Sequence, residues 1–336
     1  MPEPDDLVID HLIKEYTKEY KLSDIHIRAN QPFSIRINGD IQNFPDDMVS
    51  GENIKIFLKK HLDDDSLEKF NTEMQLDTAV VIDSIRYRVN VYQSLNGDCL
   101  VLRKIETEIP MVENLDIPAA VLSACEFKNG LILVTGPTGS GKSTTLAAMI
   151  NLINLTRKEN IITIEDPIEF VHTNQMCIVS QREIGKSAKS FAAGLKGALR
   201  EDPDIILLGE MRDYETVSAA LTAAETGHLV MGTLHTNGAA NTINRLIDVF
   251  PSDQQSQARS MLSQSMRLVV TQQLLKTRDG AGRVGAYEVM VCNNAIQNLI
   301  RENKVFQINS IMQTAFAEGM MTMEKAVANL QAMGKV

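Results

Sequence analysis

Hydrophobic positions in the first hundred residues follow a helical spacing and then a strand spacing. Between residues 7 and 20 they recur every three or four residues, which predicts an amphipathic helix. From Ile25 to Ile37 apolar and polar residues alternate, as in half-buried strands, with turns at 30–32 and 38–39. Further predicted elements are a helix at 52–72, strands at 78–82, 86–92 and 98–105, and a hairpin turn at Asn96-Gly97. Together they predict a small α+β domain with an antiparallel sheet.

Beyond about residue 116 helix and strand segments alternate instead. The predicted elements are helices at 118–125, from 145 onward, 190–199 and 214–225, and strands at 131–135, 161–164, 204–208 and 229–234. This order favours an α/β fold, a mostly parallel sheet covered by helices, with its ligand at the carboxyl ends of the strands. After Pro251 the chain is predicted to be mainly helical, with one hairpin candidate around Asp279-Gly280.

Pro110 and the charged residues before it interrupt the periodicity between the two regions. We therefore predict a domain over residues 1–106, a linker or hinge over 107–115 and a second domain over 116–336. A length of 336 residues with 44% hydrophobic content can supply a core for each domain.

Composition narrows the function classes. The net charge of -10 argues against a broad nucleic-acid surface, although it permits a local basic channel. No stretch approaches the roughly 18 uninterrupted apolar residues of a membrane span, and the N-terminus lacks a signal-peptide pattern, so we expect a cytoplasmic protein without an integral membrane segment. The four cysteines form no C-x-x-C pair and are expected to be reduced and buried.

The apolar run from Leu131 ends in glycines, a lysine and hydroxyls that fit G-x-x-x-x-G-K-[ST]. In that motif backbone N–H groups surround the phosphates of ATP, the lysine reaches the β- and γ-phosphates and the hydroxyl after it ligates Mg²⁺. An ordinary strand-turn-helix corner is the alternative. The predicted nucleotide-binding residues of this loop are Gly136, Thr138, Gly139, Ser140, Gly141, Lys142, Ser143 and Thr144.

Carboxylates follow two other predicted strands. Glu210 ends the run from Ile205, where an acid would help to hold Mg²⁺, and the alternative is a surface glutamate. Glu165, Asp166 and Glu169 lie within five residues, so they are either solvated or face a cation, and one is a candidate base for the attacking water. The alternative for Asp166 is a helix N-cap, with Pro167 in the first helical position.

Two histidines flank the strand at 229–234. His235 lies at the predicted carboxyl end, where it could donate to the γ-phosphate or to a carboxylate, whereas His228 lies at the opposite end. A strand-end histidine with only a structural role is the alternative for both.

Four segments, at 136–144, 163–169, 199–213 and 226–236, resemble the Walker A, Asp box, Walker B and His box of the ATPases that power type II secretion and type IV pili. The segment from Ser23 to Arg28 is similar to the opening of that family's PAS-like N-terminal domain, which precedes a RecA-like P-loop ATPase domain. The resemblance therefore covers nearly the whole chain.

The resemblance implies a role for each matching residue. Lys142 and Ser143 would bind phosphate and Mg²⁺, Glu169 would polarise the attacking water and Glu210 would help to hold the metal. His235 would sense the γ-phosphate, and His228, which belongs to the same box, would be one of the nucleotide-binding residues. Arg88 and Arg103 are similar to the N-terminal-domain arginines that close onto the phosphates, although without the resemblance they are ordinary exposed strand residues.

Within the family the chain resembles the retraction branch, the PilT-type twitching motility ATPases. It lacks the extra N-terminal region and the tetracysteine insertion of many extension motors, and residues 295–302 resemble the retraction motif AIRNLIRE. Gln297 departs from that motif by replacing an arginine, which removes a charge and a fork of donors. Otherwise the segment is an amphipathic helix with Ile296, Leu299 and Ile300 inward.

The resemblance further implies a homohexamer at the inner-membrane base of a pilus. It would act through an inner-membrane platform protein, without nucleic acid, and the resemblance allows a paralogous retraction ATPase as a further partner. ATP binding would rotate the N-terminal domain about a hinge near residues 107–113. The alternatives are a pilus extension or type II secretion ATPase, a weakly active accessory subunit of a partner motor and, more distantly, a nucleic-acid translocase.

Overall fold

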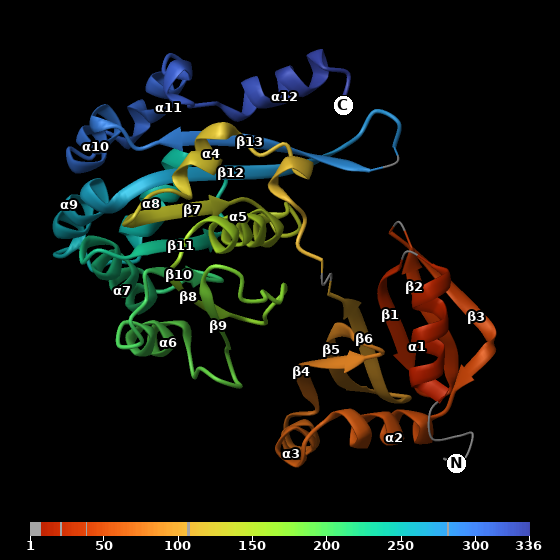
Figure 1. Cartoon of the computed structure of the whole chain (residues 1–336). Coiled ribbons are helices and arrows are strands. Elements are labelled where there is room, and N and C mark those ends of the chain that lie inside the picture. Colours follow the sequence, from red (N-terminus) through yellow and green to blue (C-terminus); the bar gives the residue numbers. More distant parts are fainter. Residues whose placement is uncertain (1–7, 21, 38, 106–107, 281) are drawn as a thin grey trace. The chain divides into compact units, whose positions relative to one another are not determined.

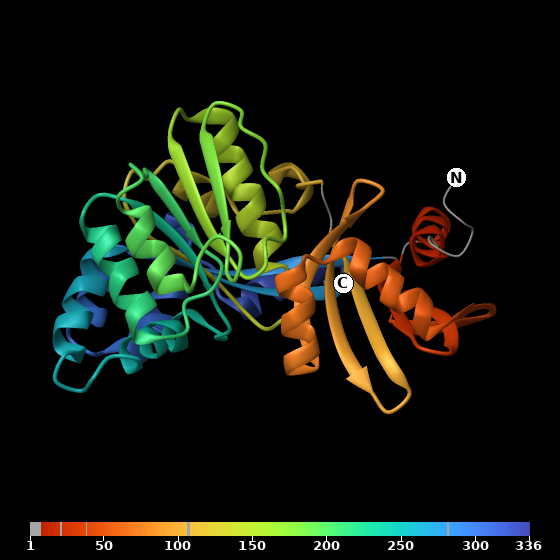
Figure 2. The ribbon, with the colours of Figure 1, turned by 90° about the horizontal axis from the view of Figure 1, so that it is seen from below.

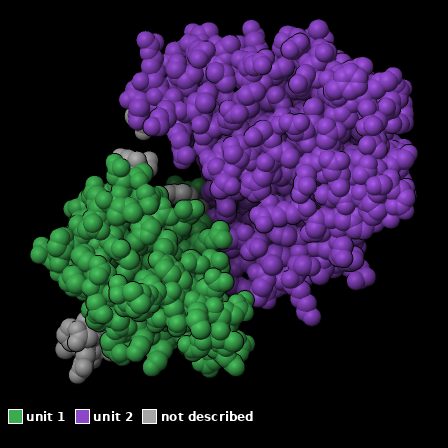
Figure 3. All heavy atoms as spheres, turned by 180° about the vertical axis from the view of Figure 1, so that it is seen from behind, with its two compact units in different colours: residues 1–108 green, residues 109–336 purple. Residues whose placement is uncertain are grey.

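The chain divides into two compact units, residues 1–108 and 109–336, which Figure 3 draws in different colours. The computed structural model describes residues 8–20, 22–37, 39–105, 108–280 and 282–336. The division lies within the segment predicted as a linker, whose first residue, Thr107, is outside the described residues, as are Leu7 and Asn38 of the predicted helix and turn. None of the helices in the described part of the chain is long and apolar enough to span a membrane.

Unit 1 is an α+β unit built on a six-stranded antiparallel sheet with the strand order β3-β2-β1-β6-β5-β4 (Figure 1). Its strands are β1 (Leu22–Arg28), β2 (Gln31–Ile37), β3 (Asp40–Val49), β4 (Gln75–Ile82), β5 (Ile85–Ser94) and β6 (Gly97–Lys104). Its helices are α1 (Val8–Glu19), α2 (Gly51–His61) and α3 (Asp64–Glu73). Alternate side chains of the strands, such as Ile25, Ile27 and Leu102, form one core with the buried side of α1 and α2.

The single helix predicted at 52–72 is wrong, because the structure has two helices there. Leu62 is extended and the Asp63 carboxylate accepts a hydrogen bond from the Ser66 amide, which starts a new helix. Four consecutive polar residues, 63–66, interrupt the hydrophobic spacing between Leu62 and Leu67, and this interruption was the available signal.

Unit 2 contains a seven-stranded sheet with the order β13-β12-β7-β11-β10-β8-β9 (Figures 1 and 2). The strands are β7 (Gly130–Thr135), β8 (Asn160–Glu165), β9 (Ile178–Glu183), β10 (Ile205–Leu208), β11 (Leu229–Leu234), β12 (Met266–Lys276) and β13 (Arg283–Val291). All neighbours pair in parallel except β12 and β13, which form an antiparallel hairpin. The predicted α/β class and the hairpin at Asp279-Gly280 are confirmed.

Helices cover both faces of this sheet. They are α4 (Ala119–Ala124), α5 (Lys142–Thr156), α6 (Phe191–Ala198), α7 (Tyr214–Glu225), α8 (Ala239–Asp248), α9 (Gln255–Ser265), α10 (Asn294–Arg301), α11 (Ile308–Met312) and α12 (Met323–Ala332), with 3-10 turns η2 (Val112–Asn114), η3 (Val305–Gln307) and η4 (Phe316–Glu318). Leu131 and Leu133 of β7 point into the core with α6 to α10, whereas Ile132 and Val134 point into the core with α4 and α5. The phosphate-loop strand is therefore buried on both sides.

Several smaller predictions can be judged from unit 2. The four cysteines are buried and free, as expected. Ile296 and Ile300 of α10 are fully buried and Leu299 nearly so, which confirms the inward face of residues 295–302. The helix predicted to begin after Asp166 is absent, because residues 166–170 form a bent loop. The N-cap alternative for Asp166 is therefore wrong.

Candidate functional site

The phosphate loop connects the carboxyl end of β7 to the first residue of α5. Gly136, Gly139 and Gly141 have φ values of 135°, 78° and 88°, a region that side-chain-bearing residues rarely adopt. The loop therefore folds back sharply, and α5 begins at Lys142, so its unpaired N–H groups face the loop. A helix N-terminus below a glycine-rich turn is a favourable site for phosphate.

Gln272, on the neighbouring strand β12, packs against this loop. A Cβ atom placed on Gly136 would lie 2.3 Å from the Gln272 carbonyl oxygen, and one placed on Gly141 would lie 2.8 Å from the Gln272 side-chain nitrogen. The Gln272 side-chain oxygen accepts a 2.8 Å hydrogen bond from the hydroxyl of Thr145, in the first turn of α5. Gly136 is thus required by packing against backbone as well as by its own backbone conformation, whereas a Cβ on Gly141 would meet only the end of the Gln272 side chain.

We expect Gly136→Ala to weaken ADP binding by at least about tenfold, because a strained backbone of about 1–3 kcal/mol and the clash with Gln272 both displace the loop. Isothermal titration with ADP measures this. The control is Gly185→Ala, which also has a positive φ, of 82°, but open space around its Cβ position. Equal affinities in the wild type and Gly136→Ala would contradict the packing argument.

Lys142 is buried and its ammonium group lies inside the loop. It donates to the carbonyl oxygens of Gly136, at 2.9 Å, and Pro137, at 3.0 Å. Burial lowers the pKa of Lys142, and the nearby carboxylates of Glu210 and Glu169 counteract that effect. These two acids, from different loops, therefore act on the same cation.

The remaining hydroxyls of the loop differ in exposure. Ser140 Oγ is buried and has no hydrogen-bond partner, while Thr138 is exposed, and Ser143 and Thr144 are half-buried in the first turn of α5. A buried hydroxyl without a partner is costly unless a ligand satisfies it. Mg²⁺ takes oxygen ligands, including one or two protein groups and substrate phosphates, so Ser143 with Glu210 fits such an ion.

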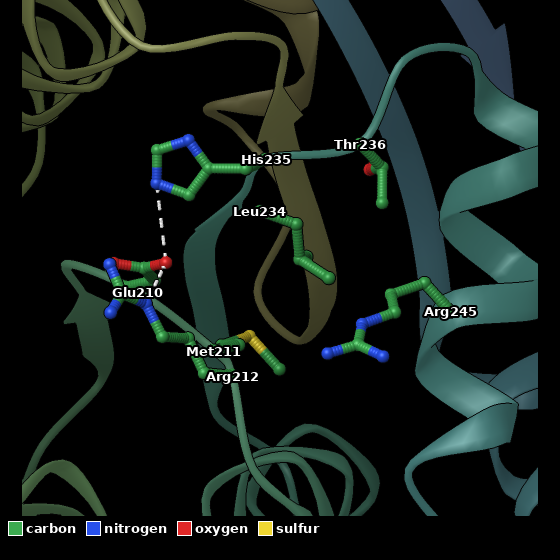
Figure 4. A pocket seen from close by; sticks show the side chains of 7 residues that line it. All are labelled: Glu210, Met211, Arg212, Leu234, His235, Thr236 and Arg245. Atoms are coloured by element: carbon green, nitrogen blue, oxygen red, sulfur yellow. Dashed lines mark hydrogen bonds and ion pairs between the residues drawn. The ribbon is translucent and has the colours of Figure 1, made fainter.

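Glu210 follows β10 and is held beside β11. The amide of Met211 donates to Thr233 O at 3.1 Å, and the Thr233 hydroxyl donates to the Gly209 carbonyl, which fixes the backbone on both sides of Glu210. Glu210 Oε1 lies 3.2 Å from His235 Nε2 and also accepts from Arg212 Nε. Figure 4 shows the imidazole and the carboxylate facing each other.

Glu210, Arg212 and His235 line a hollow of about 280 Å³ together with Thr236 and Arg245 (Figure 4). Arg212 is largely exposed, and Arg245 comes from α8, which begins after the His235 loop. One carboxylate thus faces a histidine and an arginine at the carboxyl edge of the sheet. The Glu210 carboxylate can hold a cation, and the histidine and the arginine can orient polar groups of a ligand.

The three carboxylates after β8 have different surroundings. The carboxyl group of Glu165 is buried, which raises its pKa, and its Oε1 accepts from Thr163 Oγ1 at 2.6 Å and Gln181 Nε2 at 3.2 Å. Asp166 and Glu169 are exposed. Only Glu169 of the three is among the acids that act on Lys142. Glu165 is therefore engaged in the protein, and Glu169 remains available at the loop.

A family model described as type II/IV secretion system protein matches residues 4–334 of this chain. The chain belongs to the type II/IV secretion system protein family. A twitching motility protein of Neisseria gonorrhoeae is 47% identical over 303 residues, which cover 90% of this chain and 81% of that protein. The type IV pilus retraction ATPase PilT of Pseudomonas aeruginosa is 44% identical over 315 residues, covering 94% and 91%.

A crystal structure of the pilus retraction motor PilT with bound ADP is similar over nearly the whole fold. It superimposes with a TM-score of 0.91 at 46% identity, covering 98% of this chain and 94% of that one. The similarity extends through both units, so the family assignment does not rest on the phosphate loop alone.

The family's His box contributes its two histidines to opposite edges of the sheet. His228 precedes β11, where its Nδ1 lies 3.0 Å from the Ala223 carbonyl oxygen. The phosphate loop follows β7, which pairs in parallel with β11, so the two are separated by the length of a strand, about 20 Å. Within one chain His228 therefore lies far from the phosphate loop. This differs from the prediction that His228 binds the nucleotide.

Arg88 and Arg103 lie in unit 1, directly opposite each other on β5 and β6. The next strand, β1, places Asp24 opposite Arg103, and Arg103 Nε donates to Asp24 Oδ1 at 2.8 Å. Asp24 is buried although Arg103 itself is largely exposed. The carboxylate thus orients the arginine while part of its guanidinium stays accessible.

The sequence analysis missed the roles of Gln272 and Asp24, because their partners lie far away along the chain. Gln272 contacts Thr145 from 127 positions away, and Asp24 binds Arg103 across 79 positions. Arg212 was part of a recognised segment but was not assigned to the site. Its position two residues after Glu210 was the available signal.

Proposed function

We propose that this chain is a motor ATPase that couples ATP hydrolysis to retraction of a type IV pilus. The single observation that carries the proposal is the similarity, through both units, to the ADP-bound pilus retraction motor PilT. The two Pseudomonas and Neisseria relatives, whose names refer to pilus retraction and twitching motility, support the same reading. On this proposal unit 1 is the PAS-like domain and unit 2 the RecA-like ATPase domain.

The site residues then have separate roles. The loop from Gly136 to Thr144 holds the phosphates, with Lys142 neutralising the β- and γ-groups and the buried Ser140 hydroxyl donating to a phosphate oxygen. Mg²⁺ held by Ser143 and Glu210 would supply charge neutralisation at the phosphates. The positive φ angles of the loop and the electrostatic effect of Glu210 on Lys142 support these roles.

Glu169 is the residue that polarises the attacking water. It is preferred over Glu165, whose carboxylate is already bonded to Thr163 and Gln181. His235, held against Glu210, donates toward the γ-phosphate, and Arg88 and Arg103 supply positive charge to the developing transition state. Positive charge near transferring phosphoryl groups stabilises the transition state more than the ground state.

The assembly is proposed to be a homohexamer in the cytoplasm, bound at the inner-membrane base of the pilus through a platform protein. The direction of movement is proposed from the relatives, since Gln297 replaces the arginine of the retraction motif. Gln297 lies on α10, half-buried, with its side-chain amide 3.5 Å from the Cys292 carbonyl oxygen.

Deleting the gene tests the proposed direction. We expect cells with excess surface pili and no twitching, and we expect the wild-type gene to restore both properties. Electron micrographs of pili and stab-agar motility measure the outcome. Cells without pili would instead identify an extension or secretion ATPase and would contradict the proposal.

A further inference from the structure

Two buried polar residues of the β12–β13 hairpin lie side by side beneath the phosphate loop. Gln272 and Tyr287 are direct cross-strand partners, so their side chains project from the same face of the sheet at close range. Both are buried, at 3% and 5% exposure, and a polar group at this depth requires a hydrogen-bond partner. Gln272 bonds to the first turn of α5, and Tyr287 bonds to the segment where the chain enters unit 2.

Gln272 connects to the nucleotide loop. Its side-chain oxygen accepts from Thr145, three residues after Lys142, and its backbone carbonyl oxygen lies where a Cβ of Gly136 would be. A displacement of the loop or of the first turn of α5 therefore moves groups in contact with Gln272. Protein interiors transmit such displacements because they are close-packed.

Tyr287 connects the hairpin to the segment where the chain enters unit 2. Its phenol donates a 2.9 Å hydrogen bond to the Leu115 carbonyl oxygen, in the last residue of the predicted linker. The ring lies over Gly285, where an added Cβ would be 2.7 Å from the phenol oxygen. Burial raises the pKa of Tyr287 above its usual value, although a hydrogen bond with Thr145 opposes this, so the phenol keeps its proton at neutral pH.

Helix α5 itself supports the same connection, since it also packs against the 3-10 turn η2 that contains the three residues before Leu115. Helix α5 and the segment at 112–115 are thus joined by packing, and the Gln272 and Tyr287 side chains link the first turn of α5 to Leu115. Neither residue carries any assigned role in hydrolysis.

We propose that Gln272 and Tyr287 form a positioning pair that couples the nucleotide-dependent position of the phosphate loop to the chain segment at 111–117, where the chain enters unit 2. The proposal rests on the proposed function, because it assumes that the loop binds nucleotide. The pair acts through Thr145 and Leu115 and touches no reacting atom. Its effect is on how nucleotide binding is transmitted, rather than on the chemical step.

Hydrogen exchange of the full-length protein, with and without saturating ADP, tests the coupling. In the wild type we expect ADP to increase the protection of amides at 111–117. Tyr287→Phe keeps the ring but removes the donor, and one hydrogen bond is worth about 1 kcal/mol. We therefore expect the ADP-dependent increase at 111–117 to fall about fivefold in Tyr287→Phe, while protection of the loop by ADP remains.

The matched control is Tyr214→Phe, which removes a phenol that donates to Gln254 at the surface. It should leave the response at 111–117 unchanged. Thr145→Val and Thr145→Ser provide a second test if Tyr287→Phe does not fold. Both change the first turn of α5, but only the serine keeps the hydroxyl that bonds Gln272, so Ser should retain the response and Val should lose it.

The outcomes separate the two proposals. If wild-type protein shows no protection of the loop by ADP, the proposed nucleotide site is wrong. If ADP protects both the loop and 111–117 and this persists in Tyr287→Phe and in Thr145→Val, the coupling is wrong and the proposed function stands. A fully retained response in Tyr214→Phe with a reduced one in Tyr287→Phe supports the coupling.

Discussion

Lys142→Ala is expected to lower the ATPase rate by at least about 10²- to 10³-fold, the loss usually seen when one preorganised charge or donor is removed from a transition state. The Lys142 ammonium group is held by two carbonyl oxygens of its own loop, next to Glu210 and Glu169. No other lysine in the loop can replace it. Phosphate release by the purified protein measures the rate.

Two further variants make this result specific. Lys158→Ala removes an exposed lysine after α5 and should keep the wild-type rate. Lys142→Arg keeps the positive charge, but its planar fork does not reproduce a compact ammonium group, so hydrolysis should remain strongly reduced. Wild-type hydrolysis by Lys142→Ala would show that the phosphate loop has been assigned wrongly.

Glu169→Gln should reduce the hydrolysis rate by about 10²- to 10⁴-fold, the range typical of general acid–base groups, while ADP binding stays close to wild type. Glutamine has nearly the same shape, but it cannot accept a proton from the attacking water. The contrast with Lys142→Ala is informative, because the lysine variant should lose affinity as well. Single-turnover hydrolysis and ADP titration separate the two effects.

Glu225→Gln, at an exposed position at the end of α7, is the surface control for this substitution. Glu165→Gln is the competing assignment. Because Glu165 is bonded to Thr163 and Gln181, we expect Glu165→Gln to lower the melting temperature. Its effect on the hydrolysis rate of the folded protein should be small. If Glu165→Gln abolished hydrolysis and Glu169→Gln did not, the water-polarising role would move to Glu165.

The elements around the phosphate loop could be predicted because their evidence is local. Strand β7 is a short apolar run, the loop has fixed glycines and α5 begins with good helix formers. The same holds for β8, β10 and β11, whose residues are buried on both faces and read as continuous apolar stretches. Because these strands were predicted to be parallel, Glu210 and His235, which each follow a strand, were expected at the same edge of the sheet.

Strand β9 and the sheet position of β12 could not be obtained this way. Strand β9 is an edge strand in which only Glu183 is buried, so its sequence carries little hydrophobic signal. The hairpin turn predicted β12 and β13 as partners, but nothing local indicated that β12 also pairs in parallel with β7. That pairing brings Gln272 under the loop, so the support of the phosphate site was invisible in the sequence.

The roles of single polar residues were the least accessible. Asp24 was noticed only as part of a motif, yet its buried carboxylate orients Arg103. His228 was placed in the nucleotide site by its motif, although strand direction puts it at the other edge. For Asp24 the deciding fact is which strands are neighbours, and a pattern along the chain does not contain it.

The central claim is that ATP hydrolysis by this chain drives pilus retraction, and pilus length followed over time in living cells tests it most directly. The strain should carry Lys142→Ala as its only copy, with fluorescently labelled pili. We predict that pili extend as in the wild type and then fail to shorten. Shortening at the wild-type frequency, or a failure to extend pili at all, would contradict the claim.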